Sequence, residues 1–319
     1  MASDTVLCSV VSDNFVPGFV MLERSLRATN PDWSFPMRVI YSGLDPLSER
    51  SIAVIEEHCD NVEFVMCDPT MIAPVHDYAR TVIGTPERLF PAFSILEAFR
   101  WSDVDRVIAL DSDMLVLGSL DPLLHAARPF NACRAFNSRT NQPASFFNTG
   151  VMVLNREILH GFDPNHIVQM LAGRTPRPGT GKADQAILNI LFHNEVVGYL
   201  PRRFNYTKRS LMSDLGDFAV EPPETSEGVR AFLDERDVRI LHFVGEKPWN
   251  VKVRDAENDY AMIEGIWQEA LYRLGRPGLF AMIEDLRRIW YERFVSSVRQ
   301  SRNRKGEVDE TKMGKLMGL

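Results

Sequence analysis

Residues Arg106-Val-Ile-Ala-Leu-Asp-Ser-Asp-Met-Leu-Val-Leu117 form an apolar run that is interrupted by two aspartates, Asp111 and Asp113, and then resumes. The four residues before Asp111 are all apolar, as in a strand of a parallel sheet covered by helices on both faces. Both aspartates stand where such a strand would end. The run therefore predicts an α/β fold with acidic groups at the carboxyl end of a central strand.

The aspartate pair also indicates a metal site. In extended backbone, residues two apart point to the same side, so the carboxylates of Asp111 and Asp113 are expected to meet. Like charges this close raise each other's pKa unless a cation lies between them, and oxygen ligands favour Mg²⁺ or Mn²⁺. An Asp-x-Asp turn is the simpler alternative. A turn inside an apolar run would bury unpaired charge, so the position favours a binding site.

The composition is that of an ordinary globular protein of 319 residues, with 45% hydrophobic and 25% charged residues. The net charge of −7 argues against a nucleic-acid partner, which would need a basic surface. Met1-Ala-Ser-Asp4 leads directly into a strand-like run, and no apolar stretch reaches the ~20 residues that cross a bilayer. The four cysteines lack Cys-x-x-Cys spacing, so we expect buried reduced thiols and a cytoplasmic protein.

Short apolar runs alternate with helix-like segments over residues 5–130, which is typical of βαβ units. We expect strands at 6–11, 37–41, 62–66, 107–110, 147–155 and 239–243. We expect helices at 18–28, 47–58, the later part of 87–101, and 183–192. This order predicts a mostly parallel central sheet flanked by helices.

The chain changes character after residue 255. A helical pattern extends from 259 to 304, interrupted at Gly275-Arg-Pro-Gly278, so we expect C-terminal helices over 256–300. The polar composition of 301–319 predicts a flexible tail. The last helix carries an apolar stripe: Leu279, Ile283, Leu286, Ile289, Trp290 and Phe294. The stripe either docks onto the main domain or, in a basic amphipathic helix, holds the protein at the inner face of a membrane.

A second polar group follows a late strand, in His242-Phe-Val-Gly-Glu-Lys-Pro-Trp249. His242 is either a core side chain or a ligand, since imidazole also binds Mn²⁺. Gly245 frees the backbone to turn before Lys247, which we expect on an exposed loop. A lysine near a bound metal would neutralise phosphate charge.

Four motifs now stand in order along the chain: Asp111-Ser-Asp113, Phe147-Asn-Thr-Gly-Val-Met-Val-Leu-Asn155, Ala183-Asp-Gln-Ala-Ile-Leu-Asn189 and His242-Phe-Val-Gly-Glu-Lys-Pro-Trp249. Together they resemble glycosyltransferase family 8, the group of glycogenin and the bacterial lipopolysaccharide galactosyltransferases. The opening Val11-Ser-Asp-Asn-Phe-Val-Pro-Gly18 is similar to the first β-α unit of that family. The resemblance covers most of the chain before residue 250.

The resemblance implies a GT-A type nucleotide-sugar-binding domain over residues 1–255, with Mn²⁺ (or Mg²⁺) as cofactor. It implies transfer of a hexose from a UDP-sugar, UDP-glucose or UDP-galactose, with retention and formation of an α-glycoside. The metal ligands would be Asp111, Asp113 and His242. The residues that would bind the nucleotide sugar are Val11, Ser12, Phe15, Arg88, Ser112, Asn148, Gly150, Gly245 and Lys247.

Arg88 is the least direct of these assignments. The family carries an arginine or lysine upstream of the first metal aspartate, and ungapped counting reaches Ser94 instead. Arg88 lies six residues earlier and could take that place if the helix is shifted.

Three residues are expected to act in catalysis. Departure of UDP needs a metal and a cation rather than a general acid, which gives Lys247 a role. Retention requires either a side-chain nucleophile or front-face attack guided by the departing phosphate. Asp184 is the candidate nucleophile and Gln185 its neutral competitor, and both remain open. Asp184 could instead be the N-cap of its helix.

Two other classes of protein fit parts of the pattern. A haloacid dehalogenase-type phosphatase also ends a strand in Asp-x-Asp, and a sugar-nucleotide-binding protein without turnover would need the same donor site. The acceptor (a glycan, lipid-linked sugar, protein or small molecule) is not identified, and a homodimer is left open. We expect the acceptor pocket to be built from the loops 137–146 and 206–227.

Overall fold

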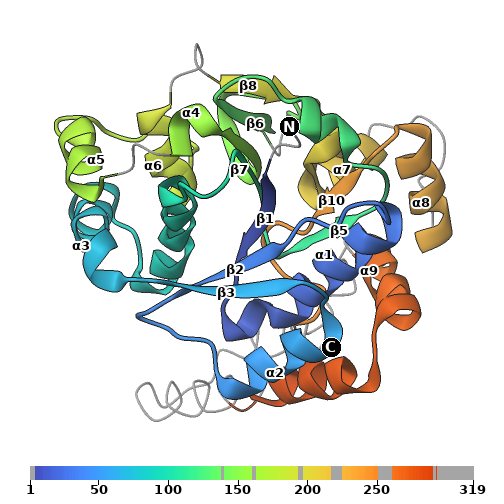
Figure 1. The fold of residues 1–319 in the computed structure, drawn as a ribbon. Helices are drawn as coiled ribbons and strands as arrows, with labels where there is room; N and C mark the ends of the chain where they lie inside the picture. Colours follow the sequence, from blue (N-terminus) through green and yellow to red (C-terminus); the bar gives the residue numbers. More distant parts are fainter. Residues whose placement is uncertain are drawn as a thin grey trace, which may run out of the picture.

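The computed structural model describes residues 4–137, 140–159, 163–192, 197–216, 225–250, 261–289 and 292. Its centre is a seven-stranded sheet in the order β3-β2-β1-β4-β7-β6-β8 (Figure 1). The strands are β1 (Thr5–Val10), β2 (Met37–Ser42), β3 (Val62–Cys67), β4 (Arg106–Leu110), β6 (Phe130–Phe136), β7 (Pro143–Asn155) and β8 (Val197–Leu200). The strand predicted before Asp111 is β4, and it lies between β1 and β7.

The sheet is mostly parallel, as predicted. β3, β2, β1 and β4 run parallel to one another, and β6 runs parallel to β8. β7 is antiparallel to both of its neighbours, β4 and β6. It is also longer than the strand predicted at 147–155, because its pairing with β6 begins at Pro143.

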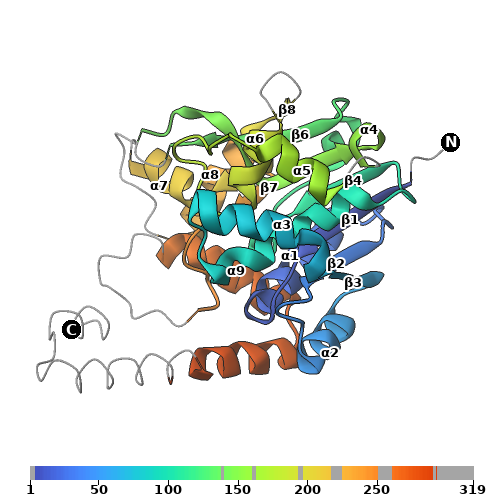
Figure 2. The same ribbon diagram turned by 90° about the vertical axis from the view of Figure 1, so that its left-hand side faces the viewer.

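Helices cover both faces of this sheet and make a three-layered α/β fold (Figures 1 and 2). In β1, Leu7 belongs to one hydrophobic core whereas Val6 and Cys8 belong to the other, as the alternation of side chains along a strand requires. The first core is covered by α1 (Val16–Thr29), α2 (Glu49–His58) and α9 (Ala261–Leu274). The second is covered by α3 (Pro69–Tyr78), α5 (Pro164–Leu171), α6 (Asp184–Leu191) and the 3₁₀ helix η3 (Glu87–Arg100).

The helical segment expected in the later part of 87–101 is confirmed, and it is a 3₁₀ helix that extends over the whole of Glu87–Arg100. Its Pro91 lacks the N–H that an α-helix interior needs. The remaining elements are α4 (Arg156–Leu159), α7 (Lys208–Gly216), α8 (Ser226–Glu235), the 3₁₀ turns η1 (Asp13–Phe15), η4 (Asp121–His125) and η5 (Arg202–Phe204), and the π-helical η2 (Ala79–Ile83).

A smaller sheet receives the chain where it leaves the large one. It contains β5 (Met114–Val116), β10 (Ile240–His242) and β9 (Tyr206–Thr207), with β10 in the middle. β5 pairs antiparallel with β10, and β10 pairs parallel with β9. The apolar run at residues 106–117 thus passes from the large sheet to the small one at Asp111 and Asp113.

The C-terminal helices pack onto the first core. After α9 the helix resumes at residues 277–289, where Leu279 and Ile283 are buried and Leu286 is partly buried. Arg50 of α2 pairs with Asp285 at 2.6 Å, and the orange segment runs beside α2 in Figure 2. Docking of the stripe is thus confirmed for these residues. Trp290, Phe294 and the tail 301–319 lie outside the described residues.

Among the residues that the structure describes, no helix is both long and apolar enough to span a bilayer. All four cysteines are buried and free, as expected.

Candidate active site

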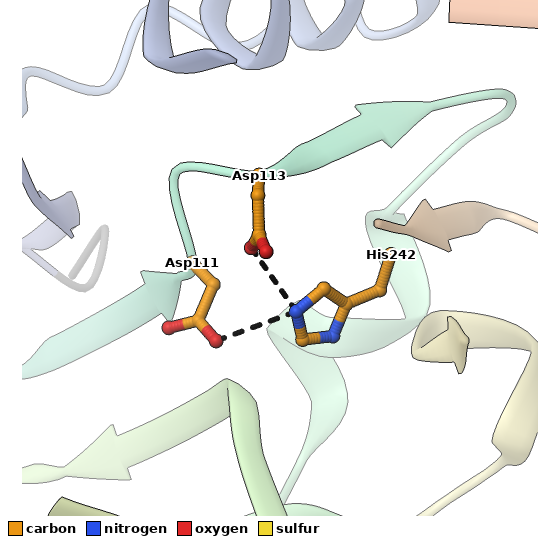
Figure 3. Close-up of side chains that lie close together, drawn as sticks. All are labelled: Asp111, Asp113 and His242. Atoms are coloured by element: carbon orange, nitrogen blue, oxygen red, sulfur yellow. Dashed lines mark ion pairs between the residues drawn. The ribbon is translucent and has the colours of Figure 1, made fainter. Parts of the chain in front are cut away.

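Asp111, Asp113 and His242 meet at the junction of the two sheets (Figure 3). Nε2 of His242 lies 3.0 Å from Oδ1 of Asp113 and 3.5 Å from Oδ2 of Asp111. One ligand atom from each residue lies within 4.8 Å of the others. His242 reaches this point because it pairs with Met114, the residue after Asp113, across β5 and β10.

The two carboxylates converge for a different reason from the one predicted. β4 ends at Leu110 and residues 112–113 form a turn, so the expectation of extended backbone is wrong. The turn that was the simpler alternative is therefore present, and it brings both carboxylates to His242. Buried charge is tolerable in this turn because cationic side chains face it.

The two carboxyls differ in environment. Burial alone would raise the pKa of Asp113, but His242 and Lys247 outweigh it and hold that pKa below its usual range. Asp111 is more open, with a side chain 49% exposed. The protein around Asp111 nevertheless desolvates it, and together with the charges of Asp113 and Asp184 raises its pKa to about 7.

Lys247 is not the exposed loop residue that we expected. Its side chain is 14% exposed, its Nζ pairs with Oδ2 of Asp113, and it donates to the carbonyl of Phe243 at 3.0 Å. Gly245 allows this return of the chain, because its φ of 81° lies in the region that favours glycine. The loop after β10 therefore brings its lysine back against the aspartate turn.

The side chains of Asp111, Asp113 and His242 fit a divalent cation. Two carboxylates and one imidazole supply the hard oxygen and borderline nitrogen donors that suit Mn²⁺, and Mg²⁺ when water completes the shell. Nε2 of His242 already points at both carboxylates, and its Nδ1 lies 2.8 Å from Oδ1 of Asn205. With Nδ1 donating to Asn205, Nε2 would be the ring nitrogen that binds a metal.

A chain of side-chain amides leads from His242 to Gln185. Asn205 Nδ2 donates to Asn148 Oδ1 at 2.6 Å, and Asn148 Nδ2 donates to Gln185 Oε1 at 2.8 Å. Gln185 Nε2 in turn donates to the carbonyl of Thr180 at 3.1 Å. Each amide has one defined orientation, so the site fixes Gln185 and His242 through one network. Sequence reasoning missed Asn205, although its place in Arg203-Phe-Asn-Tyr206, before a short strand, was a polar signal.

Gly150 leaves no room for a side chain beside His242. A Cβ at this position would lie 2.6 Å from Cε1 and 2.8 Å from Nδ1 of the ring. The backbone N–H of Gly150 donates to Asn148 Oδ1 at 2.9 Å, and its carbonyl accepts from Asp111 N at 2.9 Å. Gly150 thus contacts both His242 and Asp111, and Asn148 is held beside it.

Asp184 faces the same site from α6. α6 begins at Asp184 with Ala183 in the N-cap position, so the N-cap alternative for Asp184 is wrong by one residue. Burial raises the pKa of Asp184, against a hydrogen bond from Thr149 that lowers it. Its charge contributes to the raised pKa of Asp111.

Val11, Ser12 and Phe15 come from the segment that joins β1 to α1, and of these Phe15 has a cation–π contact with Lys247. Val11 is buried after β1, and Ser12 precedes η1. The ring of Phe15 lies 5.4 Å from Lys247 Nζ and 6.0 Å from the ring of Trp249. Trp249 binds the N-terminal segment through its Nε1, which donates to the carbonyl of Asn14 at 2.8 Å.

Ser112 joins these two segments. It is buried, and a Cβ at Gly18 would lie 2.4 Å from its carbonyl oxygen and 2.2 Å from the ring of Trp249. The close approach that a glycine permits here brings α1 against the aspartate turn.

Arg88 stands apart from this group. It is exposed at the start of η3, and its side chain has no hydrogen bond or ion pair among the described residues. Ser94, at the position reached by ungapped counting, is fully buried in η3.

An open cleft of 530 Å³ adjoins Gln185 and Asn148. Both loops predicted to form the acceptor pocket contribute to it, through Asn137 and Phe146 from the first and Arg209 from the second. Gln185 and Asn148 thus belong both to the amide network of the site and to the lining of the cleft. Residues 138–139 and 217–224 of those loops lie outside the described part of the chain.

Comparisons with known proteins agree with this geometry. Residues 6–252 match the family described as Glycosyl transferase family 8. The chain is 27% identical over 186 residues to UDP-glucuronate:xylan alpha-glucuronosyltransferase 2 of Arabidopsis thaliana, a match that covers 54% of this chain and 25% of that protein. It is 26% identical over 179 residues to glycosyltransferase GlyB of Streptococcus pneumoniae serotype 4, covering 53% of this chain and 41% of GlyB. The matches thus span less than half the length of these relatives.

Solved structures share the fold. The galactosyltransferase LgtC, solved with donor and acceptor sugar analogs, superposes with a TM-score of 0.59 at 22% identity, covering 85% of this chain and 96% of LgtC. The bifunctional glycosyltransferase WbbM gives 0.57 at 18% identity, covering 89% of this chain and 52% of WbbM. The architecture is therefore that of the GT-A glycosyltransferases. With the match over residues 6–252, the chain belongs to glycosyltransferase family 8 and is a glycosyltransferase.

Proposed function

We propose that this glycosyltransferase is a retaining, metal-dependent hexosyltransferase that uses a UDP-sugar. The observation that carries the proposal is the meeting of Asp111, Asp113 and His242 within 4.8 Å, with Lys247 paired to Asp113. Three metal-binding donors and a cation at one point suit a diphosphate leaving group. A phosphatase of the haloacid dehalogenase type has no support in the family match.

The diphosphate would lie between the aspartate turn and the loop after β10. Asp111, Asp113 and His242 would hold the Mn²⁺ (or Mg²⁺), which when bound supplies positive charge to the departing phosphate. Lys247 would release Asp113 to the metal and turn its ammonium to the diphosphate, beside the Gly245 backbone. This is how the chain would stabilise charge on UDP without a general acid.

The uracil would lie over Phe15, beside Val11 and Ser12. Phe15 is partly buried, forms an edge contact with Trp249 and has Lys247 Nζ over its ring at 5.4 Å, so a base would stack on the opposite face. Ser112 lines the same wall, beneath the ribose and phosphates. Arg88 would have to move toward the site to contact a phosphate or the ribose. An Arg88→Ala variant tests this role through its affinity for UDP.

At the sugar, Gln185 would position the anomeric carbon and Asp184 would carry negative charge. Both polar atoms of the Gln185 amide are held, by Asn148 and by the Thr180 carbonyl, so it offers a fixed surface to the anomeric carbon. Asp184 is the carboxylate that a double displacement would use as nucleophile. A front-face reaction would leave Asp184 unmodified, so mass spectrometry of the enzyme trapped with a slow donor separates the two routes.

The donor is tested by release of UDP in the presence of Mn²⁺. We expect release from UDP-glucose or UDP-galactose, its loss with EDTA, and its loss in Asp113→Asn. UDP-glucuronate is the third donor, because the named activity of the Arabidopsis relative uses it. Binding of UDP and Mn²⁺ without release, with every donor and a library of saccharide acceptors, would favour the non-catalytic binding protein and refute the proposal.

The catalytic unit would span residues 1–255, with the helices after it as a docked extension. The buried side chains of Leu279 and Ile283 support the docking of this extension, because they contribute to the first core.

A further inference from the structure

We infer that the cleft beside Gln185 binds an acceptor that carries an anionic group, a carboxylate or a phosphate. That this ligand is an acceptor rests on the proposed function, whereas its negative charge is inferred from the residues that line the cleft. The cleft is lined by Asn148, Gln185 and Asn205 at its inner end, so a molecule bound in it lies next to the amide network of the site.

The lining of the cleft has an unusual charge for this protein. Its residues are Arg134, Ala135, Phe136, Asn137, Ala144, Phe146, Asn148, Pro178, Gly179, Gln185, Asn205, Thr207, Arg209, Ser210 and Val244. Among the described residues that line the cleft, two are arginines and none is acidic, although the whole chain has a net charge of −7. A cleft that is lined by cations attracts an anionic partner, even in a protein whose net charge is negative.

Neither arginine is neutralised by an acid within the described residues. Arg134 is held rigidly, since its Nη1 donates to the carbonyl of Ala144 at 3.0 Å and its guanidinium lies 3.9 Å from the centre of the Tyr199 ring. Arg209 is exposed on α7, and its side chain has no ion pair with any described residue. Arginine forms paired hydrogen bonds to carboxylates and phosphates, so both side chains are suited to such a group.

The arginines stand at different places in the cleft. A Cβ at Gly245 would lie 3.1 Å from Nη2 of Arg209, so Arg209 borders the loop proposed to hold the diphosphate. Arg134 lies on β6, among residues that pair with β7 and β8. Arg209 could therefore contact either the acceptor or the donor diphosphate, whereas Arg134 lines the cleft from β6.

Binding of small sugars to the full chain loaded with UDP and Mn²⁺ tests the inference, with saturation-transfer NMR as the readout. The probes are glucose, glucuronate and glucose 6-phosphate. We expect both anionic probes to bind at least about tenfold more tightly than glucose, because a hydrogen bond to a charged group contributes about that factor. Arg134→Gln and Arg209→Gln should each remove most of that preference, and Arg209→Lys should keep part of it.

Arg273→Gln is the matched control, since Arg273 lies on α9 with a side chain 62% exposed. Equal binding of glucose and the anionic probes would overturn the inference. So would an Arg209→Gln variant that weakens UDP binding while the sugar preference of both variants stays intact, because the cation would then serve the donor. The NMR readout needs no turnover, so failure of sugar transfer with anionic selectivity intact would refute the proposed function alone.

Discussion

Gly150→Ala isolates the contact between β7 and the imidazole of His242. The added Cβ would lie 2.6 Å from His242 Cε1, 2.8 Å from its Nδ1 and 2.7 Å from Cε of Met114. Ordinary carbon contacts begin near 3.5 Å, so the ring would have to retreat by roughly 1 Å. Met114 can move its flexible end, but His242 is 3% exposed and has little room.

The retreat has a calculable effect on metal binding. His242 Nε2 now lies 3.0 Å from Asp113, and Nδ1 lies 2.8 Å from Asn205. A shift of about 1 Å breaks at least one of these contacts and misplaces Nε2 for a metal bond of about 2.1 Å. Loss of a partner that orients a ligand weakens metal affinity by about 10- to 100-fold, and overpacking costs about 1–3 kcal/mol of stability.

Electron paramagnetic resonance of free Mn²⁺, during titration of the UDP-bound protein, measures the affinity directly. Urea unfolding of the same samples measures the change in stability. Gly173→Ala is the control, because Gly173 has a φ of 71° and no atom within 4 Å of its Cβ position. It should lose about 1 kcal/mol from backbone strain and keep its affinity for Mn²⁺. A folded Gly150→Ala protein with the affinity of the wild type would refute the placement of His242 as a ligand.

Three further outcomes follow from the same geometry. Asp113→Asn should abolish Mn²⁺-dependent binding of UDP in a calorimetric titration, because the amide carries no charge for the metal or for Lys247; retained binding would remove Asp113 from the site. Asn205→Ala should lower Mn²⁺ affinity by about 10-fold or more and also reduce turnover at saturating metal, since both His242 and Asn148 lose their partner; an effect on stability alone would make Asn205 merely structural. Burial lowers the pKa of Lys208 to about 8 from an ordinary value of 10.5, so above pH 8 the unfolded chain holds more protons than the native one. The free energy of unfolding should therefore rise between pH 8 and 10 by on the order of 2 kcal/mol relative to Lys208→Met, and parallel pH profiles would contradict that pKa.

The large sheet was predictable because the local sequence of its strands indicates their burial. Val107 to Leu110 are buried on both faces of the sheet, and all four residues are therefore apolar. In the small sheet, β10 was expected at 239–243, whereas β5 and β9 were not predicted as strands. β5 and β10 are three residues each and β9 is two, so their existence depends on partners far away in the chain.

The same distinction holds for the site. Asp111, Asp113 and His242 stand out as charged or titratable groups at the ends of apolar runs. Asn205 has no such contrast, because its value comes from distances to His242 and Asn148 that lie 37 and 57 residues away in the chain. The buried position of Lys247 also depends on an ion pair across 134 residues, and loop composition alone predicted exposure.

The aspartate turn has a mechanical consequence as well. Asp111 follows a strand of the large sheet, whereas His242 ends the middle strand of the small one. A cation held by both would add a cross-link between two sheets that the chain already connects at residues 111–113, 117–129 and 201–205. Loading with metal should thus slow amide hydrogen exchange in β5 and β10 more than in β2 or β3, making the small sheet a gauge of occupancy.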